Sequence, residues 1–287
     1  MTATNAWIHM RPLEKVPLAE SVTTIAYGNS GSGKTTFIGS AGNDTLIIDN
    51  GKGLDALKSP YASQRFGALN PLVITIRDDR GKVFKEKPIA FDRVAEAIDW
   101  AFDTQADKFT KIAIDDATML RQDAMDKALL INDELGKSQS YKQSRAKGMR
   151  IVAVQDYGTA MDLTLQYLAH LIARCKANEK HLILASHVRE TYTKPDKIGN
   201  TPVLRRISPA FNGETFPDDV VALFDNAWFF ENVGGSKFRC RTKGDDIVTA
   251  NTSTGGIFDQ YVYDPDFQRM LTAIQASKKY AVPRSTK

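Results

Sequence analysis

The sequence predicts an α/β fold in which a mostly parallel central sheet is covered by helices on both faces. Short apolar, β-branched segments alternate with longer segments of helical periodicity, which is typical of such sheets. The 287 residues are 42% apolar and 25% charged, as in globular chains that bury a core. Because the chain contains no internal repeat and no linker rich in Pro, Gly or Ser, we expect one main domain over residues 21–276. Residues 1–20 are expected to form an N-terminal extension, and residues 277–287 a basic tail.

The first half of the chain alternates between expected strands and helices. The strands are residues 22–27 (VTTIAY), 45–49 (TLIID), 71–76 (PLVITI) and 111–115 (KIAID). Helices are expected from Gly33 to about residue 40 and over residues 91–102. Residues 51–70 are expected as a loop with one helical turn, and residues 78–88 as a turn or hairpin tip.

The second half adds two long helices, one strand and a late strand pair. A helix is expected over residues 117–135, followed by a basic segment at 137–150. Another helix carries one apolar stripe of Met161, Leu165, Leu168, Ile172 and Cys175. Residues 181–186 (HLILAS) form the next strand, residues 227–231 and 237–241 a late antiparallel pair, and residues 267–274 lie in a C-terminal helix.

Composition excludes several protein classes. Two cysteines, Cys175 and Cys240, are too few for a disulfide scaffold, so we expect reduced thiols. No apolar run approaches the roughly 20 residues that span a bilayer. The N-terminal residues also lack the apolar stretch of a signal peptide, so a cytoplasmic location is expected. The net charge of +4 only weakly favours nucleic acid as a partner.

The strongest motif is a phosphate-binding loop. Gly28-Asn29-Ser30-Gly31-Ser32-Gly33-Lys34-Thr35 fits G-x-x-x-x-G-K-[ST] at every position and lies between an expected strand and an expected helix. Its glycines let several backbone N–H groups point at one phosphate, and the helix N-terminus adds partial positive charge. Lys34 suits the β- and γ-phosphates, and Thr35 suits Mg²⁺. We therefore expect ATP with Mg²⁺, bound by residues 28–35 together with Thr36.

An acidic pair follows the strand Ile112-Ala113-Ile114. Asp115 lies where such a sheet gathers its ligands, so we expect it to hold Mg²⁺ together with Thr35. Asp116 either caps the next helix or takes part in the site.

The order of elements over residues 20–250 resembles the RecA-type ATPase core. It resembles most the short, phage-encoded RecA-like ATPases of single-strand DNA annealing and recombination. The segment Ile47-Ile48-Asp49-Asn50-Gly51 resembles the strand and turn that carry the family's water-activating glutamate, and Gly51 stands in that position. Asp49 or Asp116 would then replace the base, or hydrolysis would be slow or absent.

The resemblance also assigns roles beyond the phosphate-binding loop. In Ala185-Ser186-His187-Val188-Arg189, His187 falls where the family has a γ-phosphate sensor; the alternative is a half-buried histidine without a role. Basic residues near Arg241 and Lys243 reach the neighbouring subunit's γ-phosphate in the family, with Lys243 the better match. A ring or filament of subunits is implied by the resemblance alone.

Two basic stretches occupy the positions where RecA-type proteins have DNA-contacting loops. Residues 137–150 hold five basic residues and no acidic one, and residues 189–206 hold five basic and two acidic residues. The predicted DNA contacts are Lys137, Tyr141, Lys142, Arg145, Lys147 and Arg150 in the first, and Arg189, Tyr192, Lys194, Lys197, Arg205 and Arg206 in the second. The alternative for each stretch is a solvated surface loop.

The sequence thus favours an ATP-binding, DNA-stimulated Mg²⁺-dependent ATPase. Single-stranded DNA and further copies of the chain are its expected partners, with no membrane partner. If the chain is phage-encoded, the compartment is the cytoplasm of the bacterial host. Two alternatives stay open: a kinase for a small molecule or nucleotide, and a nucleotide-gated scaffold without turnover.

Overall fold

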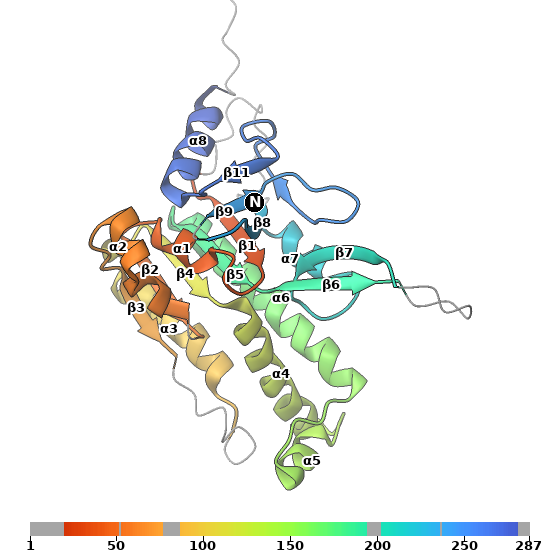
Figure 1. Ribbon diagram of the computed structural model, residues 1–287. Helices are drawn as coiled ribbons and strands as arrows, with labels where there is room; N and C mark the ends of the chain where they lie inside the picture. Colours follow the sequence, from red (N-terminus) through yellow and green to blue (C-terminus); the bar gives the residue numbers. More distant parts are fainter. Residues whose placement is uncertain (1–19, 52, 77–86, 194–201, 236, 281–287) are drawn as a thin grey trace, which may run out of the picture.

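The computed structural model describes residues 20–51, 53–76, 87–193, 202–235 and 237–280 (Figure 1). Its strands are β1 (Thr23–Gly28), β2 (Thr45–Asp49), β3 (Leu72–Thr75), β4 (Lys111–Asp115), β5 (His181–Ser186), β6 (Val188–Tyr192), β7 (Leu204–Pro209), β8 (Asn226–Asn232), β9 (Phe238–Arg241), β10 (Asn251–Thr252) and β11 (Tyr261–Tyr263). Its α-helices are α1 (Lys34–Gly39), α2 (Pro60–Phe66), α3 (Ala90–Thr104), α4 (Ala117–Glu134), α5 (Ser140–Lys147), α6 (Val154–Ala177), α7 (Phe216–Ala222) and α8 (Phe267–Tyr280), with short 3₁₀ helices η2 (Gly53–Lys58) and η4 (Ala106–Lys108).

The central sheet is mostly parallel, which confirms the predicted fold class. Its order is β11-β9-β8-β1-β5-β4-β2-β3, with β10 beside β8. Six neighbouring strands of this sheet, β3, β2, β4, β5, β1 and β8, are parallel. Beyond them, β9, β10 and β11 form antiparallel pairs. The late pair β8–β9 was predicted, but the parallel pairing of β8 with β1 was not. Strand β5 separates β1 from β4, so the phosphate-binding loop and Asp115 leave the same edge two strands apart.

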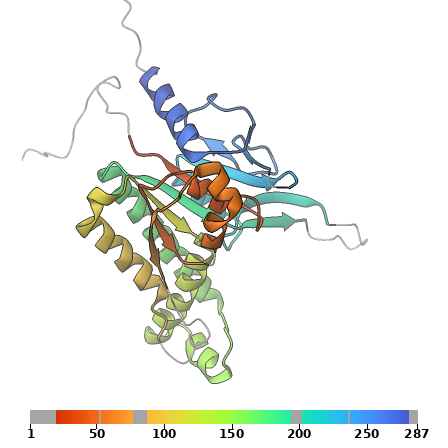
Figure 2. The same ribbon diagram turned by 60° about the vertical axis from the view of Figure 1, so that its left-hand side comes forward.

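Alternating side chains of the strands build two cores. Ile25 of β1 packs with α3, α4, α6 and α7 on one face, whereas its neighbour Ala26 packs with α1, η2 and α8 on the other. The predicted stripe of the long helix is confirmed, because Leu168, Ile172 and Cys175 of α6 are buried in the first core. Figure 2 shows α8 at one end of the molecule and the long helices α4 and α6 leading to α5 at the other.

Three segments expected as loops are regular structure instead. In residues 51–70, η2 and α2 follow each other, and Ser59 caps α2 by accepting the Ala62 N–H at 3.2 Å ahead of Pro60. The first basic stretch contains α5, which ends at Gly148 with φ of 64°. The second forms the antiparallel pair β6–β7, because each strand satisfies the backbone groups of the other.

Some expectations fall on residues outside this description. They are the N-terminal extension up to residue 19, most of the turn at 78–88, and the tail beyond Tyr280, where α8 ends. Among the described helices, none has the length and apolar character needed to cross a bilayer.

Candidate nucleotide-binding site

The phosphate-binding loop fits tightly between β1 and α1, which explains two of its glycines. A Cβ on Gly28 would lie 2.3 Å from the Phe230 carbonyl oxygen of β8, so no side chain fits there. Gly33 has φ of 93°, and a Cβ on it would lie 2.7 Å from Cγ of Phe238. The loop therefore turns directly into α1 with its backbone N–H groups at the helix N-terminus.

Lys34 lies inside the loop. Its Nζ donates to the carbonyl oxygens of Gly28 and Asn29, at 2.8 Å each. Burial lowers the pKa of this ammonium group, and the nearby Asp115 and Asp116 oppose that shift. The buried Oγ of Ser32 has no hydrogen-bond partner among the described residues, as expected of a group shaped for a ligand.

Thr35 and Asp115, the two residues predicted to hold Mg²⁺, lie in direct contact. The Thr35 hydroxyl donates to Oδ2 of Asp115 at 2.9 Å, which brings two hard oxygen ligands together. Burial raises the pKa of Asp115 to about 6, against the lowering effect of the Thr35 hydrogen bond. A Cβ on Gly53 would lie 2.7 Å from Asp115 Oδ2 and 3.1 Å from Thr35 Oγ1. Only glycine at position 53 leaves these oxygens free for Mg²⁺, so the residues fit this ion.

The Asp116 carboxylate has two contacts, one with the start of α4 and one with His187 at the end of β5. One oxygen accepts the Met119 N–H at 2.8 Å and caps α4, which was one of the two expectations for this residue. The other lies 3.3 Å from Nε2 of His187, whose backbone N–H donates to Thr118 Oγ1 at 3.1 Å. The ends of β4 and β5 therefore join directly beside the phosphate-binding loop.

A cavity of about 550 Å³ connects these groups. Its lining consists of residues 30–36, Gly51, Gly53, Ala56, Ser59, Tyr61, Asp115, Asp116, His187 and Phe238. Of the two candidate bases that replace the missing glutamate, only Asp116 lines it. Asp49 is 9% exposed, points back to the Gly51 N–H at 3.2 Å, and has its pKa raised by burial.

Sequence reasoning missed the aromatic wall of this cavity. Tyr61 of α2 and Phe238 of β9 meet edge to face, with ring centroids 6.0 Å apart. The Ser59-Pro60 helix start was a signal for α2, but nothing in the sequence pairs residues so far apart. Both rings line the cavity and offer it an apolar face, which suits contact with the base of a nucleotide.

Lys243 lies outside this cavity. It is exposed and lines a separate cavity of about 220 Å³. Its carbonyl oxygen accepts a hydrogen bond from Nε of Arg241, a buried residue that also pairs with Asp245 at 2.6 Å. Arg241 is therefore a structural residue, whereas Lys243 is exposed and does not line the nucleotide cavity of its own chain.

The structure corrects one of the predicted DNA contacts in the first basic stretch and gives a second one a protein partner. Tyr141 is only 5% exposed because its ring packs in a small core with Leu129 and Leu130, so it cannot stack on a base. Arg150 donates to both carboxylate oxygens of buried Asp126, at 2.8 and 2.7 Å. Its side chain is still 37% exposed, so its contact with DNA stays a prediction. The exposed cations of this stretch are Lys137, Lys142, Arg145, Lys147 and the ion-paired Arg150.

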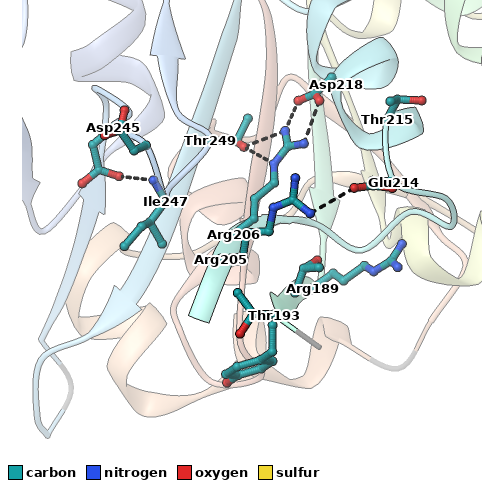
Figure 3. A pocket seen from close by; sticks show the side chains of 13 residues that line it. Arg189, Thr193, Arg205, Arg206, Glu214, Thr215, Asp218, Asp245, Ile247 and Thr249 are labelled. Atoms are coloured by element: carbon teal, nitrogen blue, oxygen red, sulfur yellow. Dashed lines mark hydrogen bonds and ion pairs between the residues drawn. The ribbon is translucent and has the colours of Figure 1, made fainter. Parts of the chain in front are cut away.

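The arginines of the second stretch gather at a larger cavity of about 990 Å³, which Figure 3 shows. Arg189, Arg205 and Arg206 line it together with the half-exposed Tyr192. All three guanidinium groups have protein partners, which the sequence did not indicate. Lys194 and Lys197 lie outside the described residues.

The fold and the site define a P-loop nucleoside triphosphatase domain. A model of the AAA domain family matches residues 20–229, well over half of the chain, so the protein belongs to this family. The family indicates nucleotide binding and hydrolysis, usually with Mg²⁺. No curated protein matches the chain.

Proposed function

We propose that this protein is a Mg²⁺-dependent ATPase whose nucleotide state controls its binding of single-stranded DNA, as in phage-type annealing or recombination. The observation that carries the proposal is the position of His187. His187 lines the nucleotide cavity and contacts Asp116. The next residue begins β6, which contains Arg189 and pairs with β7 to form the β6–β7 hairpin. A change at the γ-phosphate would therefore act on the hairpin through one residue.

The residues around the cavity have separate roles in binding and hydrolysing ATP. The N–H groups of residues 30–35 and the Lys34 ammonium bind the phosphates, and Thr35 and Asp115 hold Mg²⁺, which neutralises phosphate charge when bound. Asp116 accepts a proton from the attacking water, because among the carboxylates described above it is the one that lines the cavity without bonding Thr35. His187 holds the Asp116 oxygen in place. Tyr61 and Phe238 contact the base.

Two surfaces support nucleic-acid binding. The first surface carries the exposed cations of α5 and its flanks, at the end of the molecule opposite α8 (Figure 1). The second surface is the larger cavity, which the arginines of β6 and β7 line. A single strand that touches both would neutralise several phosphates, with Tyr192 available for stacking. The outward position of Lys243 supports assembly into a ring or filament, in which it reaches a neighbour's nucleotide.

A second candidate function is nucleotide-gated binding without turnover. The specific observation is Gly51, which lines the cavity but offers no carboxylate. This candidate predicts ATP affinity without phosphate release, even with DNA present.

The test is binding of fluorescent oligo-dT across a salt titration, with no nucleotide, ADP or a non-hydrolysable ATP analogue. We expect salt-dependent binding that strengthens with the analogue. Absence of binding in every state would contradict the proposal and would turn attention to phosphoryl acceptors. Phosphate release, measured in parallel, separates the ATPase from the scaffold.

A further inference from the structure

The cavity at the β6–β7 hairpin holds charges of both signs, already paired with one another (Figure 3). Arg206 forms a two-pronged ion pair with Asp218, with Nη1 2.7 Å from Oδ2 and Nη2 bonded to Oδ1. Arg205 Nη1 lies 3.2 Å from Oε1 of Glu214. Both acids come from one short segment at the start of α7, so that segment covers the hairpin arginines.

This covering segment is anchored by its backbone. Arg189 donates to the carbonyl oxygens of Phe211 and Gly213, at 2.8 and 2.6 Å. Arg121 of α4 donates to the Ala210 carbonyl oxygen at 2.8 Å and to Asn212 Oδ1 at 3.2 Å. Two arginines therefore fix residues 210–213, which places the two acids over the other two arginines.

A carboxylate that bonds a guanidinium group through two oxygens has the same hydrogen-bonding pattern as a phosphate. The Arg205–Glu214 pair is open to exchange, since the two side chains are 66% and 77% exposed. In the other pair Asp218 is 50% exposed and Arg206 is 26% exposed, so a ligand reaches this pair from the Asp218 side. An exposed pair joined by a single contact, such as Arg205–Glu214, contributes little to stability, whereas the two-pronged Arg206–Asp218 pair is the stronger of the two. The cavity of about 990 Å³ has room for a nucleotide unit beside them.

We propose that Glu214 and Asp218 occupy the places of two backbone phosphates, so that this cavity is a phosphodiester site masked by its own acidic segment. A single strand binds by displacing the two carboxylates from Arg205 and Arg206. This inference rests on the proposed DNA-binding function and adds to it an internal competitor that lowers affinity for the strand.

The test compares Glu214→Gln/Asp218→Asn with Asp219→Asn in the oligo-dT assay, with oligo-U as a second arm that distinguishes DNA from RNA. Asp219 is the matched control because it is exposed in the same first turn of α7 and, within the described residues, no ion pair is found for it. We expect the double variant to bind at least about 10-fold tighter at low salt. Its log–log salt slope should be steeper by about 1.4, since each added single-strand phosphate contact contributes about 0.7. Asp219→Asn should stay within about 2-fold of the native protein.

A gain in the double variant no larger than twice that of Asp219→Asn on the logarithmic affinity scale would overturn the inference, because the number of removed charges would then explain it. Native binding with no gain in the double variant would also overturn it, while leaving the proposed function intact. Binding by none of the proteins would refute the proposed function and the inference together. If circular dichroism shows that the double variant is unfolded, Glu214→Gln alone, at the more exposed pair, carries the same test.

Discussion

A substitution at Gly53 tests whether Thr35 and Asp115 form the magnesium site. The added methyl group of Gly53→Ala would lie 2.7 Å from Asp115 Oδ2, about 0.7 Å short of the 3.4 Å at which ordinary contact begins. Either the carboxylate or the η2 backbone must move by that amount. Mg²⁺ tolerates little deviation from ligand distances of about 2.0–2.1 Å. Displacing an oriented ligand typically costs about 10- to 100-fold in metal affinity, or about 1.4–2.8 kcal/mol.

The assay is the affinity of a fluorescent ATP analogue with Mg²⁺ and with EDTA. We expect Gly53→Ala to lose most of the Mg²⁺-dependent gain and to keep the EDTA value. Gly51→Ala is the matched control, because its methyl group would meet nothing closer than 3.5 Å in the same cavity. Native-like Mg²⁺ dependence in Gly53→Ala, or an equal loss in both variants, would refute the assignment.

Three further predictions concern Lys34 in the phosphate-binding loop, Arg150 after α5 and His181 in β5. Lys34→Ala should weaken ATP binding by at least about 10-fold with an unchanged circular dichroism spectrum; a native affinity would remove Lys34 from the site. Arg150→Ala removes both hydrogen bonds that buried Asp126 accepts from the guanidinium group and should cost about 2 kcal/mol, a drop of roughly 4–8 °C in Tm. Exposed Lys137→Ala should change Tm by under about 2 °C, and equal shifts would contradict the structural role of Arg150. Burial and neighbouring lysines lower the pKa of His181 to about 4 from its usual 6.5. Between pH 6.5 and 4 the unfolded chain therefore binds a proton that the folded chain does not, and the free energy of unfolding falls as the pH drops through this window. In urea unfolding, His181→Asn, which can still accept the Val22 N–H, should be less sensitive to acid over that window than the native protein; parallel curves would refute this.

Local patterns in the chain determined most of the fold and the phosphate end of the site. Alternation of apolar strands with periodic helices predicted the parallel sheet, because burial on both faces leaves a strong local signal. The phosphate-binding loop could be recognised because its contacts come mainly from the backbone of eight consecutive residues. The pairing of Thr35 with Asp115 followed from one rule, that ligands gather where parallel strands end.

Long-range contacts decided what the sequence left open. That Asp116, and not Asp49, faces the cavity depends on how β2 and β4 end against each other, and the Tyr61–Phe238 wall joins residues from distant segments. Tyr141 has the residue type and the basic neighbours of a nucleic-acid contact, yet its ring is buried beside Leu129, and Arg150 of the same stretch pairs with buried Asp126. Charge and residue type are encoded locally, but whether a cation faces solvent or an internal carboxylate depends on packing between elements. The sequence therefore determined the class of this protein, and only the tertiary structure decided which of its charged side chains remain available to a ligand.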